Sequence, residues 1–162
     1  MAEAASAPAP LSAEERERVR DLITRSVRLL DAGAFADFIA LFAPGAIYSM
    51  TSFSPEIGRD SVWLELERDE LGQLLATSWE HIHDLAARTH FVTVEDFQRV
   101  GQEIRARSSF IVFRTDEVGR TGLYAIGSYD DSISGQDQGL KITARRVRVQ
   151  TQLLPVPTPM PL

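Results

Sequence analysis

The chain has 162 residues, a length that suits one domain with a sizeable core and is too short for two ordinary domains. Its 17 basic and 23 acidic residues give a net charge of -6, which argues against nucleic acid as a partner because phosphate binding needs a concentrated basic surface. The sequence contains no cysteine, which excludes disulfides, thiol nucleophiles, Cys-ligated zinc and iron–sulfur clusters within it. Any redox chemistry that the protein supports must therefore be carried largely by another component.

The N-terminal residues 1–11 are rich in Ala, Pro and Ser, and we expect them to form a flexible tail. They lack the basic and apolar regions of a secretory signal. No stretch approaches the roughly 18 apolar residues that a membrane span requires. The sequence therefore predicts a cytoplasmic protein with no membrane contact.

Two helices are predicted after this tail. Ser12 is placed as the N-cap of the first, with Glu15 three residues later completing a capping box, and Gly33 is the expected stop. One face of this helix carries an apolar stripe at helical spacing, formed by Val19, Leu22, Ile23, Val27 and Leu30. A second, short helix is expected over 34–42, before Pro44-Gly45 ends it.

The middle of the chain is expected to contain one strand and a third helix. Residues 46–51 are predicted as a strand, and 52–60 as a loop because this segment contains Pro and Gly. Residues 61–83 have a mostly helical pattern, although the alternation over 64–67 is also compatible with an extended segment.

From residue 87 onward the pattern is that of strands separated by turn residues. Helices followed by a long antiparallel meander indicate an α+β fold, with the helices packed on one face of the sheet. We expect one domain over 12–154 and an extended Pro-rich tail over 155–162. The four predicted strands are 88–98, 102–115, 120–134 and 139–153.

The last predicted strand changes the phase of its apolar residues at Arg145-Arg146. Such a change of parity predicts a β-bulge at that point. Because bulges bend sheets, we expect a strongly curved sheet whose concave side is filled by the helices.

Two of the predicted strands are apolar at both parities, over 110–113 and over 123–126. An antiparallel sheet with one face in water should instead alternate. We infer that another subunit covers part of the outer face. The alternative is that long loops and tails of the same chain cover it.

The histidines offer little metal chemistry. His81 and His83 stand two residues apart, so on a helix they point in different directions and cannot share an ion. The acidic pair Asp130-Asp131 is interpreted as a turn or rim pair. We therefore predict no metal site and no cofactor-binding residue in this chain.

His90 is the remaining candidate for chemistry, because a strand is expected to begin near it. With a carboxylate such as Asp31 or Asp37 and the phenol of Tyr48, it could perform general acid–base catalysis in a cavity. The interpretation that we favour is a structural or interface histidine. Under that interpretation the chain has no catalytic residue.

The order of several motifs resembles the small (beta) subunits of Rieske-type aromatic-ring-hydroxylating oxygenases. The opening of the chain carries Leu29-Leu30-Asp31, Phe35-Ala36-Asp37-Phe38, Leu41-Phe42-Ala43 and Ile47-Tyr48. Three later segments also match, at Arg88–Val92, Arg107–Arg114 and Leu123–Asp131. The resemblance extends from about residue 17 to residue 154.

This resemblance implies a cystatin-like, NTF2-like α+β cone, in which a curved sheet wraps around helices. It also implies an α3β3 hexamer for aromatic compound catabolism, with this chain as a trimer that supports catalytic alpha subunits. The Rieske [2Fe–2S] cluster and the mononuclear Fe(II) would lie in the alpha subunit. Two alternatives stay open: a stand-alone NTF2-like dehydratase, isomerase or cyclase that uses His90, Tyr48 and Asp31, and a small-ligand binding module.

Overall fold

The computed structural model describes residues 10–81, 84, 86–135, 139–156 and 161–162, without the side chains of residues 78–81. The helices and strands of this part are α1 (Ala13–Asp31), α2 (Phe35–Ile39), β1 (Phe42–Ser54), β2 (Arg59–Glu67), α3 (Arg68–His81), β3 (Ala87–Val100), β4 (Glu103–Thr115), β5 (Thr121–Ser134) and β6 (Lys141–Val149).

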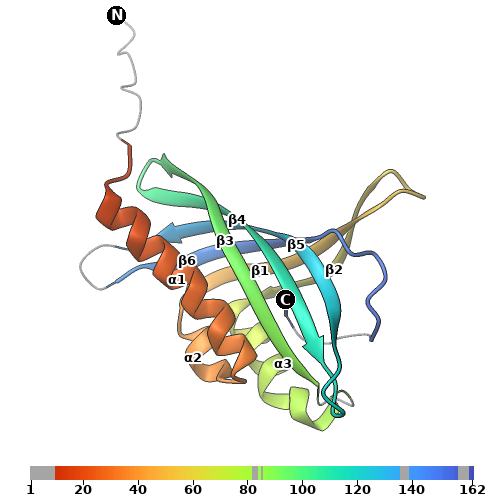
Figure 1. Ribbon diagram of the computed structural model, residues 1–162. Coiled ribbons are helices and arrows are strands. Elements are labelled where there is room, and N and C mark those ends of the chain that lie inside the picture. Colours follow the sequence, from red (N-terminus) through yellow and green to blue (C-terminus); the bar gives the residue numbers. More distant parts are fainter. Residues whose placement is uncertain (1–9, 82–83, 85, 136–138, 157–160) are drawn as a thin grey trace, which may run out of the picture.

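The strands form one six-stranded sheet in the order β2-β1-β6-β5-β4-β3. Strands β1 and β6 pair in parallel, and all other neighbours are antiparallel. The sheet is curved and open, and α1 lies across its concave side while α2 and α3 lie together near one end (Figure 1). This architecture confirms the predicted α+β fold with a mostly antiparallel sheet packed on the N-terminal helices.

Helix α1 begins and ends where the sequence predicts. The Ser12 hydroxyl accepts a hydrogen bond from the Glu15 backbone N–H at 3.1 Å, and the Glu15 carboxylate accepts one from the Ser12 N–H at 2.8 Å. Gly33, with a φ of 68°, supplies the left-handed conformation that turns the chain after the helix. The whole predicted apolar stripe of α1 is buried against the sheet.

Two polar contacts fasten α1 to β3, one at each end of the helix. Near its N-terminus Glu15 pairs with Arg99, and at its C-terminus Asp31 binds His90. The helix is therefore attached at both of its ends to β3, which is an edge strand of the sheet. Its position fixes the concave interior that the other elements share.

The region predicted as helix over 61–83 is wrong for its first seven residues. These residues belong to β2, and the predicted loop over 52–60 contracts to a turn at 55–58 because β1 continues to Ser54. The alternation that suggested an extended segment is real, since Leu64 and Leu66 are half-buried between exposed neighbours. Pairing with β1 outweighs the helical pattern because it gives the backbone N–H and C=O groups of this segment hydrogen-bond partners.

The predicted bulge in the last strand exists but lies earlier than Arg145-Arg146. Ile133 pairs with Ile142 and Ser132 pairs with Ala144, so Thr143 is the additional residue. After this bulge the inward positions are Arg145, Val147 and Val149. The position differs from the prediction because an arginine, and not an apolar residue, faces the core.

The core occupies the space between the helices and the concave face, and its largest fully buried side chains are Arg145, Tyr48, Tyr124, Tyr129, Phe38, Phe42 and Phe110. Leu11 and Leu162 also belong to it. The predicted domain boundaries at residues 12 and 154 stay predictions. Leu11 and Leu162 lie outside these boundaries and belong to the core. No helix in the described part of the chain is long and apolar enough to cross a membrane.

Candidate functional site

His90 and Asp31, two of the three predicted site residues, are in direct contact. The His90 ring Nδ1 lies 2.5 Å from Asp31 Oδ1, and the His90 backbone N–H donates to Asp31 Oδ2 at 2.8 Å. The imidazole is 2% exposed and the carboxylate 20% exposed. A carboxylate only accepts, so the hydrogen of this contact is on Nδ1.

The Nε2 atom of His90 is buried and has no hydrogen-bond partner among the described residues. The ring lies beside Phe110, with the ring centroids 6.4 Å apart. A histidine that Asp31 orients in this way resembles a base held by a carboxylate. Its interior environment is apolar on the Phe110 side.

Tyr48, the third predicted site residue, is engaged elsewhere. It lies in β1, is 1% exposed, and its hydroxyl donates to the Leu162 carbonyl oxygen at 2.6 Å. Burial raises the pKa of Tyr48 well above its usual value. Asp37, the other carboxylate considered with His90, is exposed on α2. The structure thus joins His90 to Asp31 and assigns Tyr48 a separate partner.

A buried ion pair between Arg145 and Asp131 lies deeper in the same interior. Arg145 Nε and Nη2 donate to the two Asp131 oxygens at 2.7 and 2.9 Å, and Nη1 donates to the Ser26 hydroxyl at 2.9 Å. Both side chains of the pair are 0% exposed. Burial alone would lower the pKa of Arg145, but the Asp131 carboxylate outweighs burial and raises it.

The sequence interpretation missed this pair. It placed Asp131 at a rim, yet Asp131 has the same parity as the buried Tyr129 and Ile133 in β5. That parity was the available signal. The partner strand offered none, because the bulge at Thr143 is what turns Arg145 inward.

Tyr129 completes the polar interior. Its ring stacks on Phe110 at 4.6 Å between centroids, and the Arg145 guanidinium lies 4.4 Å from its centroid. Its hydroxyl is buried without a hydrogen-bond partner in the described part of the chain. Burial raises the pKa of Tyr129 well above its usual value, so the phenol stays neutral.

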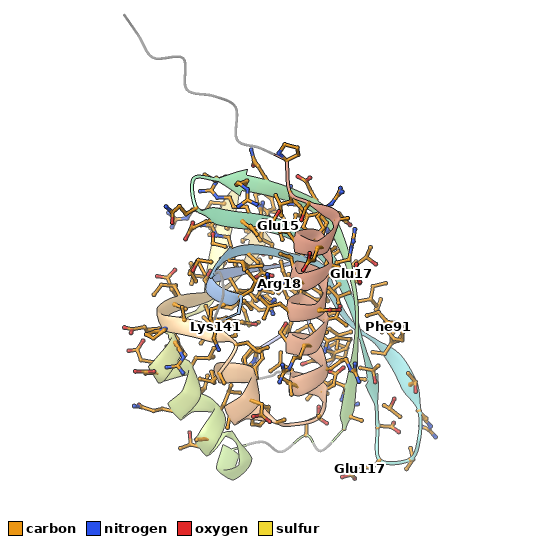
Figure 2. All side chains as sticks on the ribbon, turned by 90° about the vertical axis from the view of Figure 1, so that its left-hand side faces the viewer. Glu15, Glu17, Arg18, Phe91, Glu117 and Lys141 are labelled. Atoms are coloured by element: carbon orange, nitrogen blue, oxygen red, sulfur yellow. The ribbon has the colours of Figure 1, made fainter. Side chains whose placement is uncertain are left out.

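The outer face of the sheet carries a group of exposed and half-buried apolar side chains that we call the apolar band. Its members come from β3, β4 and β5, and they are Phe91, Ile111, Phe113, Leu123 and Ile126. Phe91 pairs with Ile111, and Ile111 pairs with Ile126, so the band crosses three adjacent strands. Phe91 is 59% exposed and Leu123 56% exposed. Figure 2 shows Phe91 on the side of the sheet away from α1.

A charged trough lies elsewhere on the same outer face. It has a volume of about 730 Å³ and receives residues from all six strands, among them Glu65, Asp96, Arg105 and Arg146. Within the described residues, Arg105 and Arg146 have no ion-pair partner. The outer face therefore combines exposed apolar side chains with arginines that have no ion-pair partner among the described residues.

A metal centre was not predicted, and the structure supplies no candidate for one in the part it describes. There, no group of three or more His, Cys, Asp or Glu side chains is arranged to hold an ion. His83 lies outside the described residues, as does the side chain of His81.

Comparison with known proteins defines the class of this chain. Residues 11–146 match the SnoaL-like domain, and the chain belongs to that family. The match extends from the start of α1 to Arg146 in β6, so it includes both the Asp31–His90 contact and the Arg145–Asp131 pair.

The individual relatives are oxygenase subunits. The chain is 24% identical over 137 residues to the beta subunit of 2-aminobenzenesulfonate 2,3-dioxygenase from Alcaligenes sp., covering 84% of this chain and 91% of the relative. It is 28% identical over 148 residues to the hydroxylase beta subunit of methanesulfonate monooxygenase from Methylosulfonomonas methylovora, covering 85% and 82%. The resemblance to oxygenase beta subunits is thereby confirmed.

A solved structure shows the same fold. It is a Novosphingobium aromaticivorans protein proposed to be the beta subunit of an aromatic-ring-hydroxylating dioxygenase, with a TM-score of 0.74 and 17% identity. The superposition covers 85% of this chain and 90% of that one. At this identity the likeness concerns the fold, and it confirms the NTF2-like curved sheet expected from the sequence.

Proposed function

We propose that this chain is the non-catalytic beta subunit of a multicomponent Rieske-type ring-hydroxylating oxygenase in the cytoplasm. It forms a trimer that holds three catalytic alpha subunits, in an α3β3 hexamer that serves aromatic compound catabolism. The observation that carries the proposal is the apolar band on the outer face, in a chain whose curated relatives are named as oxygenase beta subunits.

The apolar band supports an assembly role because its large side chains are in contact with water unless a partner covers them. Ile111 is 42% exposed and Leu123 is 56% exposed on adjacent strands. Monomeric proteins rarely leave such side chains in one contiguous patch, and patches with a charged border are typical of protein–protein contacts. The trough on the same face adds Arg105 and Arg146, which suit carboxylates of a partner.

The division of cofactors follows from the donor set. A Rieske cluster needs two cysteines and two histidines, and this sequence has no cysteine and three histidines. The mononuclear iron needs two histidines and a carboxylate with open positions. The missing cysteines assign the Rieske centre to the alpha subunit, the similarity to oxygenase beta subunits assigns the mononuclear iron there as well, and this chain contributes support.

The interior supports a structural role for His90. The stand-alone acid–base alternative needs the Tyr48 phenol beside the imidazole, whereas Tyr48 donates its hydrogen bond to Leu162. Asp31 is the last residue of α1 and His90 lies in β3, so their contact is a joint between helix and sheet. Its proposed role is to hold the cone in shape.

The test is co-expression of a tagged form of this chain with candidate Rieske large subunits. Size-exclusion chromatography with light scattering should give a hexamer with equal chain amounts, and iron should appear only in preparations that contain the large subunit. Turnover is assayed with aromatic acids and with sulfonates, because both curated relatives are named for sulfonate substrates. A monomer that retains no Rieske partner would refute the proposal.

A further inference from the structure

A hollow on the outer face of the sheet lies beside the β1–β2 hairpin and the segment that follows β6, and we call it the hairpin groove. Its volume is about 380 Å³. The charged trough is lined by acidic side chains such as Glu65 and Asp96, whereas no Asp or Glu of the described residues lines the hairpin groove. Two arginines without a carboxylate among the lining residues favour an anionic ligand. The residues that decide the chemistry of the groove are Thr51, Phe53, Arg107, Ser128, Arg148 and Gln152.

Three adjacent strands place a hydroxyl, a guanidinium and a second hydroxyl in one row of this groove. Ser128 in β5 pairs with Arg148 in β6, and Arg148 pairs with Thr51 in β1. The row lies on the outer face, because side chains alternate along a strand and the neighbouring Tyr129 and Val147 are buried in the core. Neighbouring strands are about 4.8 Å apart. The Arg148 guanidinium and the Thr51 hydroxyl can therefore bind the same small group.

The Thr51 hydroxyl is a buried donor that is not in use. Thr51 is 9% exposed, and its side-chain oxygen has no hydrogen-bond partner among the described residues. Burial of a hydroxyl without a partner destabilises a fold, so each such group calls for an explanation. Because Thr51 lines the hairpin groove, a polar atom of a ligand in the groove would satisfy its hydroxyl.

The two arginines of the groove are oriented by carboxylates that lie outside it. One terminal nitrogen of Arg148 donates to the two Asp60 oxygens at 3.4 and 3.3 Å, and Arg107 Nε donates to Asp130 at 2.9 Å. A guanidinium has five N–H donors, so each arginine keeps N–H groups that no described residue accepts from. Such groups bind a planar carboxylate well, because the fork of a guanidinium matches its two oxygens.

Phe53 gives the groove an aromatic wall. It is 52% exposed, and it lies on the same face of β1 as Thr51, two residues before it in the chain. The Gln152 side-chain amide donates to the Phe53 carbonyl oxygen at 3.3 Å, which attaches the hairpin to the segment that follows β6. An exposed aromatic ring beside two guanidinium groups suits a flat apolar body that carries a negative charge.

We propose that the hairpin groove binds a small organic acid, whose carboxylate accepts from Arg148 and Thr51 while its apolar body lies against Phe53. A neutral analogue lacks the charge that the two arginines favour, and a carboxylate without an apolar body lacks the contact with Phe53. The inference goes beyond the proposed function. The groove is on the face of the sheet opposite to the helices, and binding to it requires no partner subunit.

The experiment is calorimetric titration of the full chain with benzoate, and benzamide is the matched neutral probe. We expect saturable binding of one benzoate per chain and no saturable binding of benzamide, because the amide has no charge for the arginines to bind. Acetate keeps the carboxylate and lacks the ring, so it should bind at least about threefold more weakly than benzoate.

Two variants locate the binding site in the groove. Arg148→Gln should weaken benzoate binding at least about tenfold, the usual effect of losing hydrogen bonds from a charged group. Its control is Arg120→Gln, which removes an exposed guanidinium in the turn between β4 and β5 and should leave the affinity unchanged. Thr51→Val keeps the shape and removes the hydroxyl, so it should weaken binding about three- to tenfold without lowering the thermal midpoint of the free chain.

The absence of saturable benzoate binding to the parent chain would overturn the inference, and so would benzamide binding as tightly as benzoate. An unchanged affinity in Arg148→Gln or in folded Thr51→Val would overturn it as well, because the anion would then bind elsewhere. If Thr51→Val does not fold, Arg148→Gln and its control decide, since the Arg148 side chain is 49% exposed and its loss leaves the core intact. None of these results bears on assembly with a Rieske subunit, which the co-expression experiment measures separately.

Discussion

Arg145 and Asp131 form a fully buried, bidentate ion pair, with N···O distances of 2.7 and 2.9 Å. The third donor of the guanidinium binds Ser26, whose hydroxyl in turn donates to the Ile23 carbonyl. The pair thus connects β6, β5 and α1 through satisfied hydrogen bonds. Its geometry links the curvature of the sheet to the position of the helix on it.

Breaking this pair should be strongly destabilising. Replacing Asp131→Asn leaves the Arg145 charge buried without its counter-charge, and we expect a loss of about 3–5 kcal/mol in the free energy of unfolding, measured by urea denaturation. Arg107→Met is the control, because Arg107 pairs with Asp130 on the exposed face. That change should cost about 0–1 kcal/mol. Similar losses in both variants would contradict the role of burial.

His90 should be needed for stability and not for turnover. His90→Ala removes both the ring contact with Asp31 and the packing on Phe110, so unfolding should become easier by about 1–3 kcal/mol. The assembled oxygenase that retains this variant should keep its parent turnover rate. A purified hexamer of normal composition with no turnover would instead assign His90 to chemistry, and Asp31→Asn would then be the next variant to assay.

Asp84 should make stability depend on acid pH. Its carboxylate accepts from Arg114 at 2.9 and 2.5 Å, and this contact lowers the pKa of Asp84 below the ordinary 3.8 despite the opposing effect of burial. The unfolded chain therefore binds the proton first as pH falls. The stabilisation is complete well above pH 3.8 and disappears as pH falls through the folded pKa.

Asp84→Asn should consequently cost about 2 kcal/mol near neutral pH, where hydrogen bonds to a charged group are lost. The difference from the parent chain should shrink between about pH 5 and pH 2, as denaturation curves at each pH would show. Glu117→Gln, in the exposed turn after β4 (Figure 2), is the control and should leave the pH profile unchanged. A difference that grows toward acid pH would reverse the sign and refute the assignment.

The apolar band should determine assembly without affecting folding. Ile111→Asp places a charge in the band on a side chain that is 42% exposed, so the isolated chain should keep its thermal midpoint within a few degrees while its self-association and retention of the large subunit weaken at least about tenfold. Val118→Asp is the matched control, because Val118 is 74% exposed in the turn between β4 and β5 and is not a member of the band. Equal assembly by both variants, measured by light scattering, would exclude the band as an interface.

Gly127 should tolerate no side chain. A Cβ there would lie 2.3 Å from the Arg148 carbonyl oxygen and 2.7 Å from Phe110 Cζ, and the backbone oxygen cannot withdraw from the sheet. Gly127→Ala should therefore destabilise the fold by about 1–3 kcal/mol, as overpacking does. Gly122→Ala, in the same strand with open space around it, should change the urea midpoint little. Equal effects would show that strand propensity, and not the close approach, governs both sites.

Local signals in the sequence were sufficient where one segment decides its own structure. The Ser12–Glu15 capping box and the apolar stripe of α1 are confirmed because both depend on residues within a few turns of each other. The meander from β3 to β5 is confirmed for the same reason, since its turns and alternation are local. The absence of cysteine and the resemblance to oxygenase beta subunits likewise needed no coordinates.

Only the tertiary structure decided the features that depend on a distant partner. Residues 61–67 have a helical pattern but pair with β1, because an available strand edge outweighs local propensity. Arg145 turns inward because the bulge at Thr143 places it opposite Asp131. Tyr48 suits a catalytic phenol in the sequence, yet the residue that takes its hydrogen bond is Leu162, 114 positions away. No local pattern encodes that contact, since it exists only after the sheet has curved around the helices.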